Sequence, residues 1–187
     1  ILQSSRSCPF CNLSSANFNG KDLCGVDLSY ALLSESDLRY SNLSGAKLKR
    51  VDFSNIDLTG TILTFADLTG AKLDGSDISN KDLTGTILSF ATLTGANLDG
   101  VDLRNMDLTG VNLSRVDLSN KDLTGTILSG TIFSEANLTG VNLSNLDLTA
   151  VNLSGANLNN RDLTGTILLD ANFSGANLDG VDLRNKD

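Results

Sequence analysis

The stretch Ser119-Asn120-Lys121-Asp122-Leu123-Thr124-Gly125-Thr126-Ile127-Leu128 decides the fold, because it recurs at intervals of forty residues. It is identical to residues 79–88 and nearly identical to residues 159–168. Within each copy, a large apolar residue stands at every fifth position, usually with Asp or Asn before it and Ser or Thr after it. The chain is therefore a tandem array with a short period of five residues inside a longer period of forty.

The five-residue period predicts a coil with four sides. From Leu13 to Leu183, each of the thirty-five positions spaced by five residues holds Leu, Phe or Ile. A helix repeats every 3.6 residues and a strand every 2, so neither can keep all of these side chains on one buried face. Four pentapeptides can make one square turn of twenty residues, with one inward Leu or Phe on each side and with turns stacked about 4.8 Å apart.

The repeats also carry a family resemblance. Residues 96–100 (Ala-Asn-Leu-Asp-Gly), 136–140 (Ala-Asn-Leu-Thr-Gly) and 176–180 (Ala-Asn-Leu-Asp-Gly) resemble the A(D/N)LXX pattern of the pentapeptide-repeat family. The resemblance covers residues 11–187 and implies an all-β fold, a right-handed quadrilateral parallel β-helix of nearly nine coils. It also implies that the central Leu or Phe and the small residue two positions before it point inward, while the other three residues point outward.

The pattern predicts two parts of the chain. Residues 1–12 lie outside the pentapeptide frame and hold the only proline, so we expect an N-terminal cap there, with Leu2 and Phe10 covering the end of the core. Residues 13–187 form the β-helix. Because Lys186 and Asp187 are the first two residues of another pentapeptide, we expect the array to continue beyond residue 187.

Composition argues against catalysis and against several kinds of partner. The chain has no His and three Cys, so most catalytic constellations and metal sites cannot be assembled, and we expect no enzyme activity and no cofactor. A formal charge of −8 argues against direct binding of nucleic acid, which needs a basic face. No apolar run approaches the roughly 18 to 20 residues that cross a bilayer, so we expect no membrane insertion.

Four long basic side chains occupy the small inward position of their repeats: Lys21, Lys81, Lys121 and Arg161. Their numbers differ by multiples of twenty, so they share one face. Either the stem packs at a corner while the charge turns to the next residue, an Asp in each case, or the face is a recognition strip of basic and acidic groups. The candidate residues of this strip are Lys81, Asp82, Asp102, Lys121, Asp122, Arg161 and Asp162.

The row of Asp82, Asp102 and Asp122 also raises the question of a calcium site. We expect these side chains on successive coils, where they would repel one another unless Lys81 and Lys121 neutralise them. One flat row offers too few convergent oxygens for Ca²⁺, so we expect no metal site.

Outward isoleucines form a second departure from the pattern. Ile87, Ile127 and Ile167 share one face and stand where Asp or Asn is usual, with Phe90 near the first of them. Asp107 and Asp147 interrupt this row on the coils between. The row is therefore either a set of isolated surface residues or a contact face.

The segment Cys8-Pro9-Phe10-Cys11 allows three interpretations. A zinc half-site lacks two further ligands, since only Cys24 remains, and a thioredoxin-like motif lacks its βαβ context. The segment is similar to the N-terminal cap of cyanobacterial pentapeptide-repeat proteins, some of which look exported to the periplasm or thylakoid lumen. This resemblance favours a Cys8–Cys11 disulfide and an oxidising compartment, whereas free thiols would favour the cytoplasm. We expect Cys24 to point outward as a free thiol.

These observations predict a non-catalytic structural scaffold or protein-interaction rod whose protein partner the sequence does not specify. The architecture also allows self-association end to end or face to face. The alternative comes from the resemblance, because some pentapeptide-repeat proteins mimic the B-DNA rod and protect gyrase, a type II topoisomerase, from quinolones. The acidic charge suits this alternative, but the carboxylates are scattered over several faces and fourteen Lys and Arg dilute them.

Overall fold

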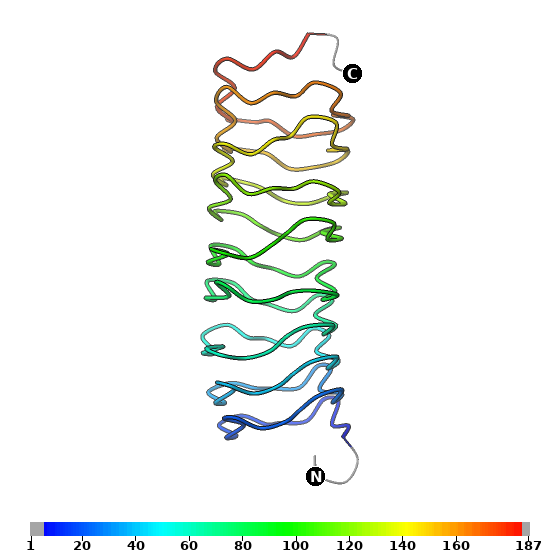
Figure 1. Cartoon of the computed structure of the whole chain (residues 1–187), viewed down its shortest axis with the longest axis vertical. Helices are drawn as coiled ribbons and strands as arrows, with labels where there is room; N and C mark the ends of the chain where they lie inside the picture. Colours follow the sequence, from blue (N-terminus) through cyan, green and yellow to red (C-terminus); the bar gives the residue numbers. More distant parts are fainter. Residues whose placement is uncertain (1–5, 185–187) are drawn as a thin grey trace. The chain divides into compact units, whose positions relative to one another are not determined.

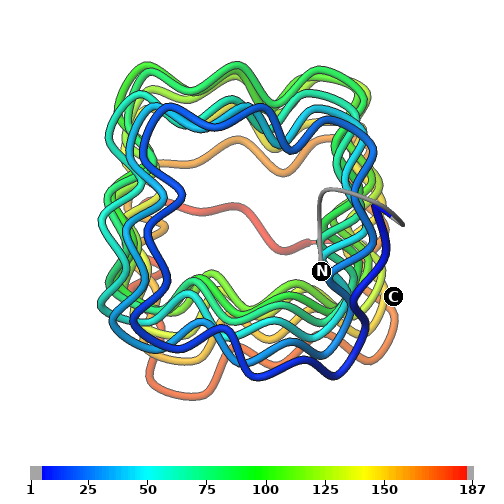
Figure 2. The same ribbon diagram turned by 90° about the horizontal axis from the view of Figure 1, so that it is seen from below.

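A computed structural model describes residues 6–184 of the chain. It falls into two compact units, Ile1–Val101 (unit 1) and Asp102–Asp187 (unit 2). In both units the backbone advances as a coil (Figure 1). Seen along the coil, each turn has four sides that meet at four corners (Figure 2).

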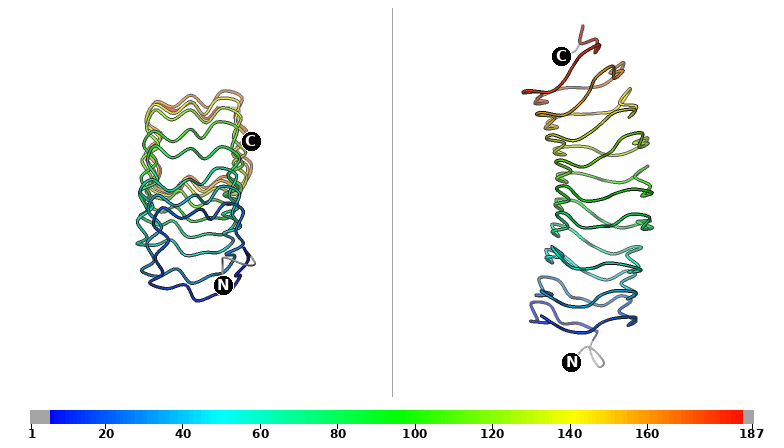
Figure 3. Two further views of the ribbon diagram at one scale, coloured as in Figure 1. Left: turned by 60° about the horizontal axis from the view of Figure 1, so that its bottom comes forward. Right: turned by 90° about the vertical axis from the view of Figure 1, so that its left-hand side faces the viewer.

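Successive turns are joined by parallel β-bridges between residues twenty apart. Ser7 pairs with Asp27 and Asn17 with Asp37 in unit 1, and Asp107 pairs with Ile127 in unit 2. Each side is short, so residues 6–184 contain no helix and no strand longer than a single bridge. The side views show these turns stacked within each unit (Figure 3). The spacing of twenty residues confirms the prediction of four pentapeptides per turn.

The central residues of the repeats fill the interior of each unit. Leu28, Leu48 and Leu68 follow one another at intervals of twenty residues in unit 1, as do Leu123 and Leu143 in unit 2. Each of these five side chains is at most 1 % exposed. Burial of a leucine contributes about 1.5–3 kcal/mol, so each repeat adds its own increment of stability to the coil.

Each corner is a four-residue turn that begins at a central residue. The amide of Ala16 donates to the carbonyl of Leu13 (3.1 Å), and the same bond recurs along the chain. The third residue of the turn, called the corner site below, has a positive φ: +63° at Gly20, +55° at Asn80 and +59° at Phe65. Gly and Asn tolerate this conformation best, which explains why they are frequent at every fifth position from residue 15 onward.

The Asp or Asn before each central residue stabilises the corner that follows. This position is called the flank site below. Its Oδ1 accepts a hydrogen bond from the amide two residues later, as from Thr59 to Asp57 (2.8 Å) and from Ser154 to Asn152 (3.0 Å). Short polar side chains make such local bonds readily. The sequence indicated only that these residues point outward, so their structural task is a finding of the structure.

The forty-residue period arises because a corner side chain lies over the corner of the next coil. A Cβ added at Gly100 would overlap Oδ1 of Asn80, and a Cβ added at Gly140 would overlap Oδ1 of Asn120. Glycine at these corners therefore avoids an overlap with the Asn side chain of the preceding coil. Gly and Asn alternate on successive coils, and the same corner residue returns after two coils, which is forty residues.

The regular bonding already includes residues 6–12, which we predicted to be part of the cap. The amide of Cys8 donates to the carbonyl of Asp27 (2.7 Å), and Cys8 is 4 % exposed at the place of a central residue, five positions before Leu13. Phe10 does not cover the core, and that prediction is wrong. It is 72 % exposed and its ring stacks on Tyr30, with centroids 4.7 Å apart. Leu2 lies outside the described residues.

Candidate functional site on the outward faces

Lys81 turns toward backbone carbonyls of the preceding coil. Its Nζ donates to the carbonyl oxygens of Leu58 (2.6 Å) and Thr61 (3.3 Å). The expectation that its charge turns to Asp82 is therefore wrong. Burial lowers the pKa of Lys81, and the carboxylates whose charges raise it are those of Asp77 and Asp57. The carbonyl oxygen of Leu58 already accepts a hydrogen bond from the amide of Thr61 (3.0 Å), and the ammonium of Lys81 uses the second lone pair of this oxygen.

The other cations of the column differ in exposure. Arg161 is half-buried and donates to the carbonyl oxygens of Asn159 (3.1 Å) and Val141 (3.4 Å). Only its bond to Val141, twenty residues earlier, matches a bond of Lys81, the one to Thr61. Lys121 is half-buried, and its charge lowers the pKa values of Asp102 and Asp117 after larger contributions from hydrogen bonds. Lys21 is exposed.

The acidic members of the predicted strip act first as flank-site caps. The amides of Thr84, Thr124 and Thr164 donate to Asp82, Asp122 and Asp162 at 2.8 to 2.9 Å. The exposed Asp82 belongs to unit 1, whereas Asp102, Asp122 and Asp162 belong to unit 2.

Arg104 also belongs to this row in unit 2 and was not predicted from the sequence. Its guanidinium pairs with Asp102 (NH2 to Oδ2, 2.6 Å), and the hydrogen bond from its side chain lowers the pKa of Asp102 to about 2. Arg104 also lowers the pKa of Asp122, although the bonds from Thr124 contribute more. A basic residue two positions after a flank Asp was the signal, and it recurs as Asp37-Leu38-Arg39.

Substitution of Lys81 separates the hydrogen bond from the charge. Thr61 already donates its hydroxyl to the carbonyl of Leu38 (2.9 Å) from the equivalent position one coil earlier. A Lys81→Thr variant is therefore expected to keep a bond to Leu58, whereas the isosteric Lys81→Val variant loses it. We expect Lys81→Val to be less stable than Lys81→Thr by about 1 kcal/mol in urea unfolding. Equal stability of the two variants would contradict the assigned bond.

The same variants test a pH dependence. Because the folded pKa of Lys81 is lowered, the unfolded chain binds more protons between the folded pKa and the ordinary value near 10.4, and the free energy of unfolding rises with pH in that window. Below the window both states are protonated, and this contribution is constant. We expect urea unfolding at pH 7 and pH 10 to show this rise in the parent chain and to show it reduced in both variants.

The outward isoleucines lie next to threonines that point inward. The hydroxyl of Thr86 donates to the carbonyl of Leu63 (2.9 Å) and that of Thr166 to the carbonyl of Leu143 (3.0 Å). Ile has no side-chain oxygen, so it cannot accept the hydrogen bond that Asp or Asn accepts from a backbone amide at the flank site. Ile87, Ile127 and Ile167 are 47 to 55 % exposed, and Phe90 is 63 % exposed. Ile87 and Phe90 belong to unit 1, and Ile127 and Ile167 belong to unit 2.

In unit 1 the exposed apolar surface is larger than the sequence indicated. The ring of Tyr40 lies over Gly60 and the ring of Phe65 lies over Gly85, so that a Cβ added at either glycine would overlap ring carbons. These glycines stand two residues before Ile62 and Ile87. The exposed fractions are 62 % at Tyr40, 48 % at Ile62, 64 % at Phe65, 47 % at Ile87 and 63 % at Phe90.

These five residues form one surface, called the apolar band below, that follows the coil over two sides of unit 1. Ile87 and Phe90 were predicted from the sequence as candidates for a contact face. The missed signal was the recurrence of Gly twenty residues after an aromatic corner residue, which leaves room for each ring over the glycine two residues before the next coil's isoleucine.

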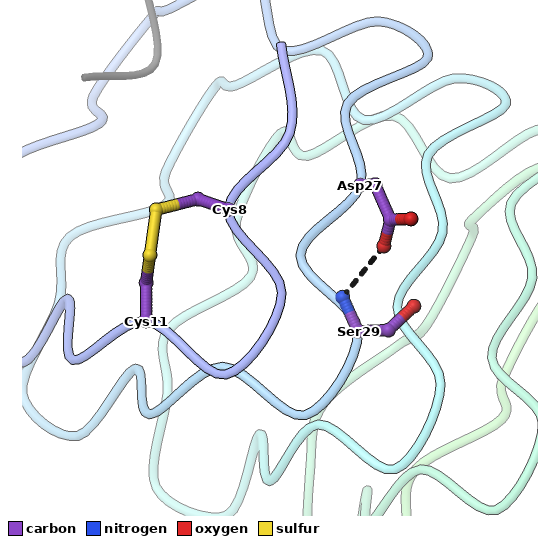
Figure 4. Close-up of a disulfide and its surroundings, with 4 residues drawn as sticks. All are labelled: Cys8, Cys11, Asp27 and Ser29. Atoms are coloured by element: carbon purple, nitrogen blue, oxygen red, sulfur yellow. Dashed lines mark hydrogen bonds between the residues drawn. A yellow bond between two sulfur atoms is a disulfide. The ribbon is translucent and has the colours of Figure 1, made fainter. Parts of the chain in front are cut away.

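Cys8 and Cys11 form a disulfide across the first described corner, with Cα atoms 5.4 Å apart (Figure 4). Cys8 takes a central place and Cys11 the inward place of the following side. In the same view, Oδ1 of Asp27 accepts the amide of Ser29 (3.1 Å) on the neighbouring coil. Cys24 is a free, partly exposed thiol, as expected from its outward position.

Two further features are absent from residues 6–184. No three His, Cys, Asp or Glu side chains lie together in an arrangement that could hold a metal ion. No helix there has the length and apolar character needed to span a membrane.

Comparison with known proteins gives a family match along nearly the whole chain. The sequence model of the pentapeptide repeats matches over residues 10–39, 27–64, 66–105, 86–125, 107–145, 117–155 and 147–185. A comparison with curated proteins finds none that matches. The match confirms the fold predicted from the sequence, a right-handed quadrilateral β-helix.

Solved structures of the same repeat type are similar over most of the chain. HetL, a pentapeptide repeat protein involved in heterocyst differentiation regulation from the cyanobacterium Nostoc sp. strain PCC 7120, is 29% identical, with 98% of this chain and 92% of HetL covered and a TM-score of 0.40. QnrB1, a plasmid-mediated fluoroquinolone resistance protein, is 17% identical, with 95% and 92% covered and a TM-score of 0.36. A protein of the Arabidopsis thaliana thylakoid lumen is 28% identical, with 73% and 71% covered and a TM-score of 0.17.

Proposed function

The chain belongs to the pentapeptide-repeat family, and from this premise we propose that it is a non-catalytic scaffold that binds a protein partner through the apolar band of unit 1. The interior is filled by the repeats, so a ligand must meet the outward side chains. The band offers five large apolar side chains, each about half exposed or more. Contiguous exposed apolar surface of this kind is typical of protein contact sites.

The observation that carries the proposal is that the aromatic corners are not required by the fold. In unit 2, Asn105, Asn120 and Asn145 lie over the glycines of the next coil just as Tyr40 and Phe65 do in unit 1. Asn tolerates a positive φ better than an aromatic residue does, yet Tyr40, Phe65 and Phe90 hold φ values of +58° to +61°. A bulky residue in this region is strained by about 1 kcal/mol, and such strain is retained at functional positions.

Replacing the rings by Asn tests the band without breaking the fold. The triple variant Tyr40→Asn, Phe65→Asn and Phe90→Asn is expected to be as stable as the parent chain or slightly more stable in thermal unfolding. When each chain is used to capture proteins from an extract of the native source, the triple variant is expected not to retain the partner protein that the parent chain retains. Glu35→Asn is the matched control, because it changes a corner site with a φ of +58° outside the band. Retention of the same protein by the triple variant would overturn the role of the band.

A DNA-mimic role on gyrase is the second candidate from the sequence. Several carboxylates are neutralised locally, since Asp37 pairs with Arg39, Asp102 with Arg104, and Glu135 with Arg115 at 2.6 to 2.8 Å. This pairing favours the scaffold. Added protein should leave the supercoiling activity of gyrase unchanged, and inhibition at stoichiometric protein would favour the mimic instead.

The Cys8–Cys11 disulfide supports a location in an oxidising compartment such as the periplasm or the thylakoid lumen. We expect mass spectrometry of the unreduced native protein to find these two cysteines bonded to each other. Reduction should increase hydrogen exchange in the first coil, for example at the amides of Cys11 and Leu13, and leave unit 2 unchanged, because a linear array frays from its end. Two free thiols in the native protein would remove the support for this location.

A further inference from the structure

The row of outward residues on one side of unit 2 differs from the same row in unit 1. Asp107, Ile127, Asp147 and Ile167 alternate on successive coils, with Leu169 beside the last of them, and these five residues are called the acid–isoleucine strip. Bridges join Asp107 to Ile127 and Asp147 to Ile167. Ile127 and Leu169 are 55 and 56 % exposed, and Asp107 and Asp147 are also exposed.

The carboxylates of the strip lack the counterions found on the matching row of unit 1. There, Lys47 pairs with Asp27 (3.8 Å) and Lys49 with Asp67 (3.2 Å). The ion pairs recorded for residues 6–184 involve neither Asp107 nor Asp147. The outward positions of this side hold Asp, Thr, Ile, Ser and Leu, with no Lys or Arg. The strip therefore combines uncompensated negative charge with exposed apolar area.

The carboxylates remain available because their structural bond uses one oxygen. Oδ1 of Asp107 accepts the amide of Thr109 (2.9 Å), and Oδ1 of Asp147 accepts the amide of Thr149 (2.9 Å). Hydrogen bonds from Thr149 also lower the pKa of Asp147, so it is ionised at neutral pH. The second oxygen of each group can accept a bond from a cation outside the unit.

We propose that the acid–isoleucine strip docks an amphipathic cationic α-helix of a partner protein. The coils rise about 4.8 Å each, so like residues of the strip recur after about 9.6 Å. A helix rises about 10.5 Å in seven residues, so a Lys or Arg repeated every seventh residue meets Asp107 and Asp147, and a Leu midway between meets Ile127. The corner sites along one edge of the strip are Gly110, Gly130 and Ala150, which let a helix approach closely.

The strip does not suit a second copy of itself. Two such strips face to face would bring carboxylates together without a counterion, and like charges in contact oppose association. The inference rests on the proposed scaffold function, and it concerns a surface in the other unit from the apolar band.

The test uses a labelled synthetic peptide of about 18 residues that is helical, with Lys at every seventh position and Leu midway on the same stripe. Binding to the full chain is measured by fluorescence anisotropy at low and high salt. Two control peptides are used: a scrambled sequence of the same composition, and the helical sequence with Glu in place of Lys. The helical Lys peptide is expected to bind at least tenfold tighter than either control.

Variants of the chain assign the binding to the strip. Asn is a regular flank residue and can accept the amide of the residue two positions later, so Ile127→Asn with Ile167→Asn is expected to fold and to weaken binding about tenfold or more. Asp107→Asn with Asp147→Asn should weaken it about threefold at low salt, and less at high salt. Ile132→Asn makes the same change on another side of unit 2 and should leave binding within about twofold of the parent.

Equal binding of the helical and scrambled peptides, or unchanged binding after the double Ile change, would overturn the proposal. So would a dimer of the parent chain in sedimentation that the double Ile change dissociates, since a second copy would then cover the strip. The triple ring variant of the apolar band should bind the peptide normally. Failure of the strip and failure of the proposed function are therefore distinguishable.

Discussion

Replacing Leu123 with Asp is expected to unfold unit 2 or to cause aggregation. Leu123 is 1 % exposed in the interior column that also holds Leu143. A carboxylate at this buried place loses its hydration, which costs several kcal/mol, a large share of the stability of an ordinary domain. Thermal unfolding by circular dichroism and size-exclusion chromatography would show the loss.

Ile127→Asp is the matched control for this change. It places the same carboxylate four residues later, at an exposed flank site where Asp is the usual residue and can accept the amide of Ser129. We expect its thermal midpoint to stay close to that of the parent chain. A Leu123→Asp protein as stable as Ile127→Asp would contradict the division of the repeat into inward and outward positions.

The second large effect concerns the corners. Gly130 and Gly140 have φ values of +65° and +77°, so Ala is strained at both, but only a Cβ at Gly140 would overlap Oδ1 of Asn120, while Gly130 has nothing within 4 Å. We expect Gly140→Ala to destabilise the chain by about 2 kcal/mol and Gly130→Ala by about 1 kcal/mol in urea unfolding.

Asn120→Gly should recover the additional loss, because it removes the side chain that overlaps the new methyl group. Its own φ of +58° suits glycine. A double variant no more stable than Gly140→Ala alone would show that the corner contact does not cause the effect.

The sequence predicted the fold because inward positions place the same demand on every repeat. A buried position needs an apolar side chain whatever its neighbours are, so an unbroken row such as Leu103, Leu123 and Leu143 is visible without coordinates. Cys24 could likewise be placed outward from its position in the repeat alone.

The contacts of the surface side chains could not be predicted to the same degree, because an outward side chain has several polar neighbours within reach. Lys81 has Asp82 beside it in sequence, yet its ammonium reaches Leu58 and Thr61 on the preceding coil, since the inward start of the side chain directs it there. The rings of Tyr40 and Phe65 could be placed only once the contact of each corner with the next coil was known. Arg104 differs from these residues, because its pairing with Asp102 has a sequence signal, a basic residue two positions after a flank Asp.

All of these assignments depend on two periods. The position of a residue within a coil of twenty residues determines where its side chain points, and the position of a corner within a pair of coils determines whether Gly or Asn suits it. Two deletions within unit 2 separate these periods. Deletion of residues 121–140 removes one coil and brings Asn120 over Asn160 and Asp107 beside Asp147. Deletion of residues 121–160 removes two coils and places Asn120 over Gly180 and Asp107 beside Ile167, which restores the native pairs.

The most direct measurement is the thermal unfolding midpoint of these two variants. A repeat array normally loses stability as coils are removed, so length alone makes the larger deletion the weaker protein. The corner alternation predicts the reverse order, with the shorter chain unfolding at the higher temperature. A higher midpoint for the chain that lacks only residues 121–140 would contradict the account.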